Sequence, residues 1–376
     1  MMIGFDAKRA AQNKTGLGNY SRFVIEALTR FAPNERYLLY IPNPNRTSSL
    51  NGIEKANNVE LRYPQTTFWK KFRSLWRVGG ITSDIEKENI RLFHGLSNEL
   101  PLNIRKAENT RSIVTIHDLI FLRYPEYYHY IDRKIYAYKF RKACQNADRI
   151  IAVSECTKRD IISFFHIPEE KIDVVYQGCD AQFKQAVPEN TKEEIRRKYQ
   201  LPQRYILYLG SIESRKNLLL IAKALLHIQE PITVIAIGKR TPYAETVEDF
   251  LRKNHLENRM RLLSNIPFKE LPAFYQMATT FVYPSFFEGF GIPLLEALNS
   301  GVPAIGATGS CLEEAGGPHS IYIHPEDDKG LAKAIEQTLT DQSLRERMIK
   351  EGKKYALLFE EEKLTKDLLN VYRKTI

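Results

Sequence analysis

Two carboxylates lie eight residues apart in the segment Tyr283–Pro303, YPSFFEGFGIPLLEALNSGVP. Glu288 stands in a glycine-rich stretch, whereas Glu296 lies in an apolar stretch that follows Pro293. Because proline is favoured in the first turn of a helix, this spacing predicts a loop that carries Glu288 and a helix that carries Glu296. A carboxylate in an apolar segment is costly without partners, and carboxylates accept bidentate hydrogen bonds from sugar hydroxyls. The pattern indicates a sugar or anion site; the alternative is an exposed Glu296 with Glu288 as a helix cap.

Two adjacent cations, Arg215 and Lys216, lie in the segment YLGSIESRKNLLL. The pattern predicts a strand that ends at Gly210 and a helix that begins near Asn217. Positive charge is unfavourable just before a helix N-terminus, so this placement favours a functional role. Both cations could bind a diphosphate leaving group. The alternative is a solvated basic corner.

A further candidate is the segment KTGLGNYS, in which Gly16 and Gly18 would let the backbone approach a ligand closely. A helix from Asn19 would then direct free amides at an anion, although such turns often only connect a loop to a helix. A dinucleotide-binding fingerprint would place Gly or Ala at Ser21 and an acid after the second strand. Neither is present, which argues against an NAD-dependent enzyme.

His117 and Asp118 end a predicted strand, SIVTIHD. Ionisable side chains at the carboxyl end of a strand are typical of a ligand site in open α/β sheets. The alternative is a helix start with Asp118 as its N-cap.

Short apolar segments that alternate with helical patterns predict parallel βαβ units in both halves of the chain. The predicted strands are MIGFDA, YLLYI, RLFHG, SIVTIHD, RIIAVS and KIDVV, and then YILYLG, ITVIAIG, RLLS, TFVYPS and VPAIGA. We therefore expect an α/β fold of two doubly wound Rossmann-like domains, residues 1–185 and 186–362. Residues 363–376 form a further amphipathic helix that could dock on either domain.

Composition limits the class of protein. The chain has 376 residues, of which 43% are hydrophobic, and it has no run of eighteen apolar residues that could span a membrane. The first residues, MMIGFDAKRA, lack the pattern of an export signal. The four cysteines show no paired spacing, which favours free thiols over disulfides or a zinc site. We expect a cytoplasmic protein.

The net charge of +10 is carried almost entirely by the first half. Residues 1–185 contain 29 Lys and Arg against 20 Asp and Glu, or +9, whereas the remainder (55 − 29 = 26 against 45 − 20 = 25) has +1. This asymmetry indicates an anionic partner on the first half. No recognised nucleic-acid-binding motif accompanies the charge, which disfavours nucleic acid.

The segment TTFWKKFRSLWRV predicts one basic amphipathic helix with an aromatic face. Such helices bind anionic membrane surfaces, and the candidate membrane or acceptor residues are Trp69, Lys70, Lys71, Arg73 and Trp76. The alternative is that the aromatic side chains belong to the core. A second cluster, RYPEYYHYIDRKIYAYKFRK, has tyrosines that could stack on a sugar or a lipid acceptor.

The segment EGFGIPLLEA resembles the Glu-x7-Glu signature of the retaining family 4 glycosyltransferases, which have the GT-B fold of two facing Rossmann-like domains. The segments TGLGNY, TIHDL, AVSECTKRDI and GSIESRKN also stand in that family's order and spacing, and the resemblance covers almost the whole chain. It implies an acceptor-binding first domain and a nucleotide-sugar-binding second domain, with a ligand cleft between them.

The resemblance implies roles for the candidate residues. Glu296 would bind the ribose of the nucleotide, Glu288 would hold the transferred hexose, and His117 would contact the sugar near its reacting carbon. Arg215 and Lys216 would neutralise the diphosphate, with help from amides near Gly16 and Gly18. The remaining donor-binding positions are Gly289, Phe290, Gly291 and Ile292 for the hexose, and the backbone around Ile266 and Phe268 for the base. Ser211 stands where many members carry an arginine, so one phosphate contact is lost or is replaced by Arg215.

The resemblance also implies chemistry. The form ESRKN is similar to that of mannosyltransferases that use GDP-mannose in surface-polysaccharide assembly, and the acceptor would be a saccharide or a lipid-linked saccharide. No Asp-x-Asp occurs, so we expect no metal and no cofactor besides the nucleotide-sugar donor. Retaining glycosidases place two carboxylates about 5 Å apart; we expect Glu288 and Glu296 to lie farther apart, which favours front-face displacement. The alternatives are a non-hydrolysing nucleotide-sugar epimerase and a non-catalytic nucleotide-sugar-binding subunit.

Overall fold

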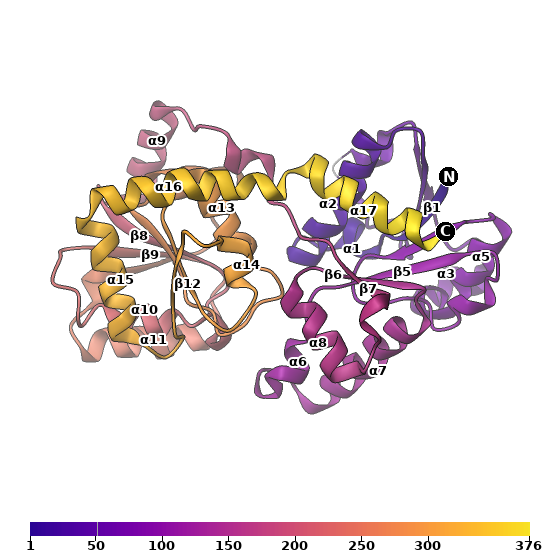
Figure 1. Cartoon of the computed structure of the whole chain (residues 1–376), viewed down its shortest axis with the longest axis horizontal. Helices are drawn as coiled ribbons and strands as arrows, with labels where there is room; N and C mark the ends of the chain where they lie inside the picture. The colour runs from indigo at the N-terminus through magenta and orange to yellow at the C-terminus, as the bar shows by residue number, and fades with distance from the viewer. Residues whose placement is uncertain (51) are drawn as a thin grey trace. The chain divides into compact units, whose positions relative to one another are not determined.

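The computed structural model describes residues 1–50 and 52–376, and the chain divides into two compact units (Figure 1). Unit 1 comprises Met1–Gln177 and Glu360–Ile376, and unit 2 comprises Gly178–Phe359. The first unit therefore ends before the predicted boundary at residue 185. Phe183 explains the difference, because its buried ring packs edge-on against Tyr275 of unit 2, with 5.5 Å between ring centroids.

Among the described residues, unit 1 forms a seven-stranded parallel sheet in the order β3-β2-β1-β4-β5-β6-β7. Its strands are β1 (Met2–Asp6), β2 (Arg36–Tyr40), β3 (Val59–Arg62), β4 (Leu92–Gly95), β5 (Arg111–Ile116), β6 (Arg149–Ala152) and β7 (Ile172–Val174). Alternate side chains of a strand point to opposite faces of a sheet. Accordingly, Leu38 and Tyr40 enter one core cluster, and Tyr37 and Leu39 enter the other.

Helices cover both faces of this sheet, as parallel strands with two buried faces require. The helices of unit 1 are α1 (Lys8–Gln12), α2 (Gly16–Phe31), α3 (Thr67–Lys71), α4 (Arg73–Leu75), α5 (Ile81–Lys87), α6 (Ile120–Arg123), α7 (Tyr130–Asn146), α8 (Glu155–Phe165) and α17 (Glu361–Thr375). The terminal helix α17 buries Leu368, Val371 and Tyr372 in the core of unit 1. The Tyr372 hydroxyl also lies 2.7 Å from Nδ1 of the buried His94, so α17 is part of this unit.

Unit 2 repeats the architecture with a six-stranded parallel sheet, all within the described residues, in the order β10-β9-β8-β11-β12-β13. The strands are β8 (Tyr205–Leu209), β9 (Thr233–Ile237), β10 (Met260–Leu263), β11 (Thr280–Tyr283), β12 (Ala304–Ala307) and β13 (Ile321–Ile323). The helices are α9 (Glu189–Tyr199), α10 (Leu218–Ala224), α11 (Tyr243–Lys253), α12 (Leu271–Met277), α13 (Ile292–Ser300), α14 (Leu312–Gly316), α15 (Asp328–Thr340) and α16 (Gln342–Ala356).

Two strands were missed by the sequence analysis, β3 and β13, and both lie at the edge of a sheet. Edge strands are short and only half covered, so their sequences lack the continuous apolar run of a central strand. The segment VELR alternates apolar and charged residues, and IYI has only three residues.

Strand order locates the ligand-binding edge of each sheet. In the first sheet β1 lies between β2 and β4, so the chain builds the sheet outward from β1 in both directions. In the second sheet β8 lies between β9 and β11 in the same way. Open α/β sheets bind ligands beyond the carboxyl ends of the strands at such a switch point. The loops that follow β8 and β11 are therefore the first place to look for a site in unit 2, as are those after β1 and β4 in unit 1.

Candidate functional site

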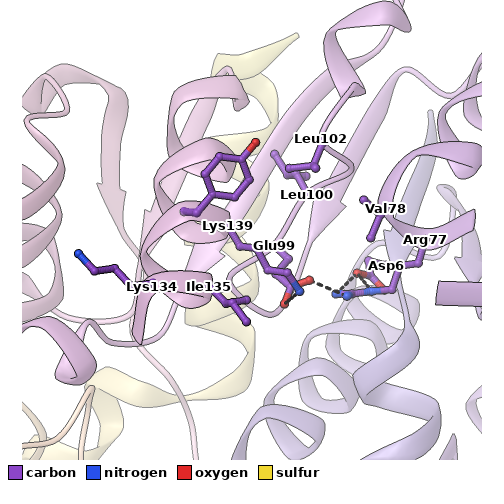
Figure 2. A pocket seen from close by; sticks show the side chains of 10 residues that line it. Asp6, Arg77, Val78, Glu99, Leu100, Leu102, Lys134, Ile135 and Lys139 are labelled. Carbon is purple, nitrogen blue, oxygen red and sulfur yellow. Dashed lines mark hydrogen bonds and ion pairs between the residues drawn. The ribbon is translucent and has the colours of Figure 1, made fainter. Parts of the chain in front are cut away.

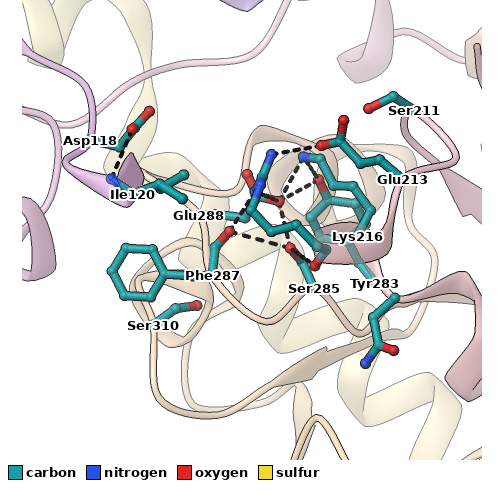
Figure 3. A network of polar contacts seen from close by, with 12 residues as sticks. Asp118, Ile120, Ser211, Glu213, Lys216, Tyr283, Ser285, Phe287, Glu288 and Ser310 are labelled. Atoms are coloured by element: carbon teal, nitrogen blue, oxygen red, sulfur yellow. Dashed lines mark hydrogen bonds and ion pairs between the residues drawn. The ribbon is translucent and has the colours of Figure 1, made fainter. Parts of the chain in front are cut away.

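Four polar side chains of unit 2 converge on one carboxylate oxygen (Figure 3). Oε1 of Glu288 lies 2.6 Å from Nζ of Lys216 and 3.0 Å from Nη1 of Arg215. It also accepts hydrogen bonds from the hydroxyls of Ser285, at 2.7 Å, and Tyr283, at 3.0 Å. The second oxygen, Oε2, takes part in none of these four contacts. The structure thus brings together the three charged residues that the sequence singled out at this edge.

Backbone and side-chain bonds tie the two loops of this cluster together. Arg215 and Lys216 lie in a 3-10 turn, Ser214–Lys216, between β8 and α10. Asn217 follows in the left-handed conformation, with φ of 61°, which asparagine tolerates better than most residues. The side-chain amide of Asn217 donates to the carbonyl oxygen of Pro284 at 3.1 Å. The backbone amide of Phe286 donates to the carbonyl oxygen of Arg215 at 2.9 Å. The cations are therefore fixed against the loop that follows β11.

The charges of the cluster keep Glu288 ionised. Burial raises the pKa of this carboxyl, but attraction to Lys216 and Arg215 outweighs the burial and lowers the pKa to about 2. Arg215 also pairs with the more exposed Glu213, with 2.9 Å between Nη2 and Oε1. A bound diphosphate could take the place of Glu213 without disturbing the contacts to Glu288.

A buried thiol supports the glycine loop that carries Glu288. Sγ of Cys311, the residue before α14, lies 3.0 Å from the carbonyl oxygen of Glu288 and 2.9 Å from that of Phe290. Gly291 has φ of 112°, and a Cβ there would lie 2.8 Å from the side chain of Leu312. The sequence analysis treated Cys311 only as one of four free thiols, because the cysteines show no paired spacing.

The other donor-binding candidates occupy the same edge of the sheet or the helix behind it. Gly289 and Phe290 belong to the glycine loop, and α13 begins at Ile292. Ser211 follows β8, and its carbonyl accepts a hydrogen bond from the Tyr208 hydroxyl at 3.2 Å. Ile266 and Phe268 lie in the loop and 3-10 turn after β10.

Glu296 is buried in α13, with 7% of its surface exposed, so it does not lie on the polar side of that helix. Its Oε2 accepts a hydrogen bond from the hydroxyl of Tyr275 at 2.9 Å. Burial raises the pKa of Glu296 to about 8, although the bond from Tyr275 opposes the rise. This carboxyl is protonated at neutral pH, in contrast to Glu288.

We expect Glu296→Gln to become more stable relative to the natural protein as the pH rises from 5 to 8. The folded protein keeps the Glu296 proton up to about pH 8, whereas the unfolded chain releases it near its ordinary value of 4.5. The folded state therefore binds more protons in this window, and its free energy of unfolding falls by up to about 1.4 kcal/mol per pH unit. Glutamine does not titrate and avoids this loss. Chemical denaturation at pH 5, 6.5 and 8 measures the difference.

The exposed Glu313→Gln is the matched control for this measurement. Its stability difference from the natural protein should stay constant over the same pH range. An equally constant difference for Glu296→Gln would show that Glu296 is ionised in the folded state.

In unit 1, His117 is buried and both of its ring nitrogens have partners. Nε2 lies 2.9 Å from the carbonyl oxygen of Leu96, and Nδ1 lies 3.4 Å from Nε2 of Gln177. The ring of Tyr20 packs edge-on against the imidazole at 4.6 Å. Burial lowers the pKa of His117 to about 4, so the side chain is neutral at pH 7. A ligand that bonds to Nδ1 would have to replace Gln177.

The glycine turn of unit 1 differs from the prediction. Helix α2 begins at Gly16 and not at Asn19, and the amides of Gly18 and Asn19 both donate to the carbonyl of Thr15, at 2.9 and 3.0 Å. A Cβ at Gly18 would lie 1.9 Å from the carbonyl oxygen of Asn13. Gly18 is therefore required by packing against its own loop, and its amide is already used inside the helix. A ligand contact near Gly18 stays a prediction, and it would have to use amides other than that of Gly18.

Substitutions at the two glycines should separate these effects. Gly18→Ala should lower the free energy of unfolding by about 1–3 kcal/mol, because the new methyl group collides with backbone that has no room to shift. Gly16→Ala is the matched control, since a Cβ there meets nothing within 4 Å. Alanine in a helix is favoured over glycine by roughly 0.5–1 kcal/mol, so Gly16→Ala should be neutral or stabilising. Equal stability of the two variants in thermal unfolding would contradict this explanation.

The predicted basic amphipathic helix is interrupted. Helix α3 ends at Lys71, α4 follows after Phe72, and a π-helical turn spans Trp76–Gly80. Trp76 is 1% exposed, and its indole Nε1 donates to Asp84 at 2.7 Å. Trp76 is therefore a core residue and not a membrane or acceptor residue. The prediction was wrong because a single helical wheel cannot describe a segment whose helix type changes.

The rest of that segment has mixed exposure. Trp69 is partly buried and packs on Gly80, where a Cβ would lie 2.7 Å from the indole. Lys70 and Lys71 are exposed, and Arg73 is half-buried. Phe68, Phe72 and Leu75 of the same segment are exposed, at 56%, 41% and 56%, so basic and apolar side chains remain together on the surface here.

Neither a membrane-spanning helix nor a cluster of metal-ligating side chains is found among the described residues. No helix among them is both long and apolar enough to cross a bilayer. In the same residues, no group of three or more His, Cys, Asp or Glu side chains is arranged to hold a metal ion. The four cysteines, Cys144, Cys156, Cys179 and Cys311, are buried thiols.

Two family models match the chain. The one described as Glycosyltransferase Family 4 matches residues 24–183, and the one described as Glycosyl transferases group 1 matches residues 191–355. O-antigen chain mannosyltransferase B of Escherichia coli is 32% identical over 290 residues, which cover 75% of this chain and 74% of that protein. O-antigen chain mannosyltransferase RfbU of Salmonella typhimurium is 26% identical over 222 residues, 59% of each chain.

Solved structures share the fold over the whole chain. A glycosyltransferase of Rickettsia africae ESF-5 superposes with a TM-score of 0.78 at 15% identity, covering 100% of this chain and 98% of that one. Anabaena Alr3699/HepE, solved in complex with UDP and glucose, superposes with a TM-score of 0.76 at 16% identity and 99% coverage of each. The expected fold class, two parallel Rossmann-like domains of the GT-B type, is confirmed.

Proposed function

The chain belongs to the family 4 glycosyltransferases, and from this premise we propose that it transfers mannose from GDP-mannose to a saccharide or lipid-linked acceptor in surface-polysaccharide assembly. The names of its two mannosyltransferase relatives support the sugar and the process. The observation that carries the proposal is the convergence of Arg215 and Lys216 on Glu288 at the switch point of unit 2. Cations at a switch point suit a diphosphate, and a carboxylate beside them suits sugar hydroxyls.

The proposed reaction retains the anomeric configuration and needs no metal. The bond between the sugar C1 and the β-phosphate oxygen breaks, and the acceptor oxygen forms its bond to C1 on the same face. The departing phosphate takes the acceptor's proton. Arg215 and Lys216 stabilise the charge that develops on the phosphate, and such preorganised charges are commonly the largest contribution to catalysis. Glu288 and His117 hold the sugar, and Glu296 holds the ribose.

We also propose that the enzyme works in the cytoplasm at an anionic membrane surface. The support is the concentration of net positive charge in residues 1–185, because basic surfaces are attracted to anionic lipids. Trp76 is not part of this surface.

Donor preference tests the proposal directly. Thermal unfolding with GDP-mannose, GDP-glucose, UDP-glucose and UDP-galactose should give the largest rise in Tm with GDP-mannose, because a ligand at 100 times its Kd stabilises the folded state by about 2.7 kcal/mol. The same protein with GDP-mannose and a mannose-containing acceptor should release GDP and extend the acceptor. Conversion of the donor to its epimer without acceptor would identify an epimerase, and donor binding without turnover would identify a binding subunit.

A further inference from the structure

Four buried polar side chains of unit 1 form one hydrogen-bonded network that ends beside His117. The hydroxyl of Tyr372, in α17, lies 2.7 Å from Nδ1 of His94, in β4. Nε2 of His94 lies 2.8 Å from Oγ1 of Thr115, in β5, and that oxygen lies 3.2 Å from the hydroxyl of Tyr20, in α2. None of the four residues is more than 4% exposed. This buried network therefore joins two strands of the sheet to the helices α2 and α17.

The buried network carries no net charge, and its bonds can all be made at once. Burial lowers the pKa of His94 to about 3, so this imidazole is neutral at pH 7. A neutral imidazole donates from one nitrogen and accepts at the other, and a hydroxyl can do either. The two nitrogens of His94 thus match the two hydroxyls that face them. A satisfied network of this kind makes a core rigid and specifies one arrangement of its side chains.

Tyr20 carries this order to His117. Its ring packs edge-on against the imidazole, with 4.6 Å between ring centroids and an interplanar angle of 89°, which is a preferred geometry for aromatic pairs. A tyrosine side chain has only two rotatable angles. The ring contact with His117 and the hydroxyl bond to Thr115 fix both of them, so loss of the hydroxyl bond would let the ring tilt against the imidazole.

The orientation of His117 decides which hydrogen bond its side chain can make to a ligand. Nε2 lies 2.9 Å from the carbonyl oxygen of Leu96, and a carbonyl oxygen only accepts, so Nε2 carries the proton. Nδ1 is then an acceptor, and the side-chain amide of Gln177 faces it at a long 3.4 Å. The backbone of His117 is held separately, by the side chains of Asn98 at 2.7 Å and Thr157 at 3.2 Å. What the buried network controls is therefore the plane of the imidazole.

We infer that the buried network is a positioning device for sugar transfer, which holds the imidazole of His117 at the angle where Nδ1 accepts a hydrogen bond from a sugar hydroxyl. Its members act through His117, so none of them is a catalytic residue. The inference deepens the proposed function and rests on it, since His117 is the residue proposed to hold the sugar. It also gives the terminal helix α17 a part in the site, in addition to its apolar contacts with the core.

Thr115→Val tests the inference, because it removes the central hydroxyl of the buried network and keeps the size of the side chain. We expect kcat for transfer to fall about tenfold or more, since small misplacements near a reacting centre lose rate steeply, with little change in the KM for GDP-mannose. NMR spectra of the ¹⁵N-labelled histidines, with His117 assigned from His117→Asn, should show one Nε2–H tautomer in the natural protein. Thr115→Val should show mixed tautomers, because a tilted ring loses the bond to Leu96. Thr115→Ser keeps the hydroxyl and should restore the single tautomer and most of the rate.

Tyr372→Phe and Tyr37→Phe give a matched pair. Tyr372→Phe removes one buried hydroxyl from the far end of the buried network. Tyr37 is fully buried in the same core cluster, but its hydroxyl lies against the carbonyl oxygens of Leu28, at 3.0 Å, and Ala32, at 2.8 Å. Both variants should lower the Tm by a similar few degrees, and only Tyr372→Phe should mix the tautomers of His117 and lower kcat. Equal effects of the two substitutions would overturn the inference, and this pair remains informative if Thr115→Val fails to fold.

The spectrum and the rate together separate failure of the inference from failure of the proposed function. An unchanged His117 spectrum in Thr115→Val and Tyr372→Phe would overturn the inference. A changed spectrum with the natural rate would also overturn it, because the angle of the ring would then not matter to transfer. If the natural protein transferred no sugar from GDP-mannose while the spectra of the variants changed, the network would still position His117, and the proposed function alone would be contradicted.

Discussion

Lys216→Ala should lower kcat for sugar transfer by about 10²–10³-fold, or roughly 2.7–4 kcal/mol of transition-state stabilisation. The amine of Lys216 is fixed by Glu288 at 2.6 Å and by the hydroxyl of Tyr283, so it needs no reorganisation when charge develops on a departing phosphate. Its side chain is 14% exposed, and a shielded charge interacts more strongly than one in water. Initial rates of GDP release with acceptor present measure the effect.

Lys223→Ala is the control for this substitution. Lys223 lies in α10, shortly after the 3-10 turn of Lys216, and is exposed. It should leave kcat unchanged, and both variants should unfold within a few degrees of the natural protein. If Lys216→Ala transferred sugar at the rate of the natural protein, Lys216 would have no part in the mechanism. The interpretation of this cluster as a diphosphate site would then be wrong.

The Lys216–Glu288 contact is one that sequence reasoning could reach. The two residues are far apart in the chain, but each follows a strong apolar strand, YILYL or TFVY, and those strands are neighbours at the switch point. Parallel strands bring their carboxyl ends to one edge, so strand recognition alone predicts proximity. The added donors, Ser285 and Tyr283, depend on the side-chain register at the end of β11, and no periodic pattern encodes that.

The acceptor side shows what such reasoning misses. A helical wheel assigned Trp69 and Trp76 to one exposed face, but Trp76 turns inward because its indole donates to Asp84 and its ring packs in the core. Arg77, the cation that follows Trp76, is held by Asp6 and Glu99 in a pocket of unit 1 (Figure 2). These partners come from other elements of the fold, so tertiary contacts decided which of the basic residues stayed on the surface.

Gly18 and Cys311 illustrate the same limit at the level of backbone. The glycine pattern of residues 14–21 predicted the start of a helix near the right place, yet the reason for Gly18 is the carbonyl of Asn13. Cys311 supports the Glu288 loop through two carbonyl oxygens. A motif records that a residue type is needed, and the packing around it shows whether a ligand or the protein itself imposes that need.

Glu288→Gln should separate sugar transfer from nucleotide binding. The amide cannot neutralise Arg215 and Lys216, which lie 3.0 and 2.6 Å from Oε1, so the cluster gains about one positive charge. Opposite charges a few ångströms apart attract by several kcal/mol near a protein surface, and GDP should therefore bind about tenfold more tightly, as calorimetry can measure.

Transfer by the same variant should fall about 100-fold or more, because an amide accepts fewer hydrogen bonds from the hexose than a carboxylate does. Tighter GDP binding together with slower sugar transfer distinguishes a carboxylate that holds the sugar from one that only maintains the structure. Loss of a purely structural carboxylate would weaken GDP binding and slow transfer alike. Glu213→Gln gives the graded comparison, because Glu213 pairs only with Arg215 in this cluster and is 37% exposed. Its affinity for GDP should rise less than that of Glu288→Gln, and its transfer rate should fall less. Weaker GDP binding by Glu288→Gln would mean that the carboxylate acts mainly by holding the two cations in position, and the sugar would then have to be held by other groups.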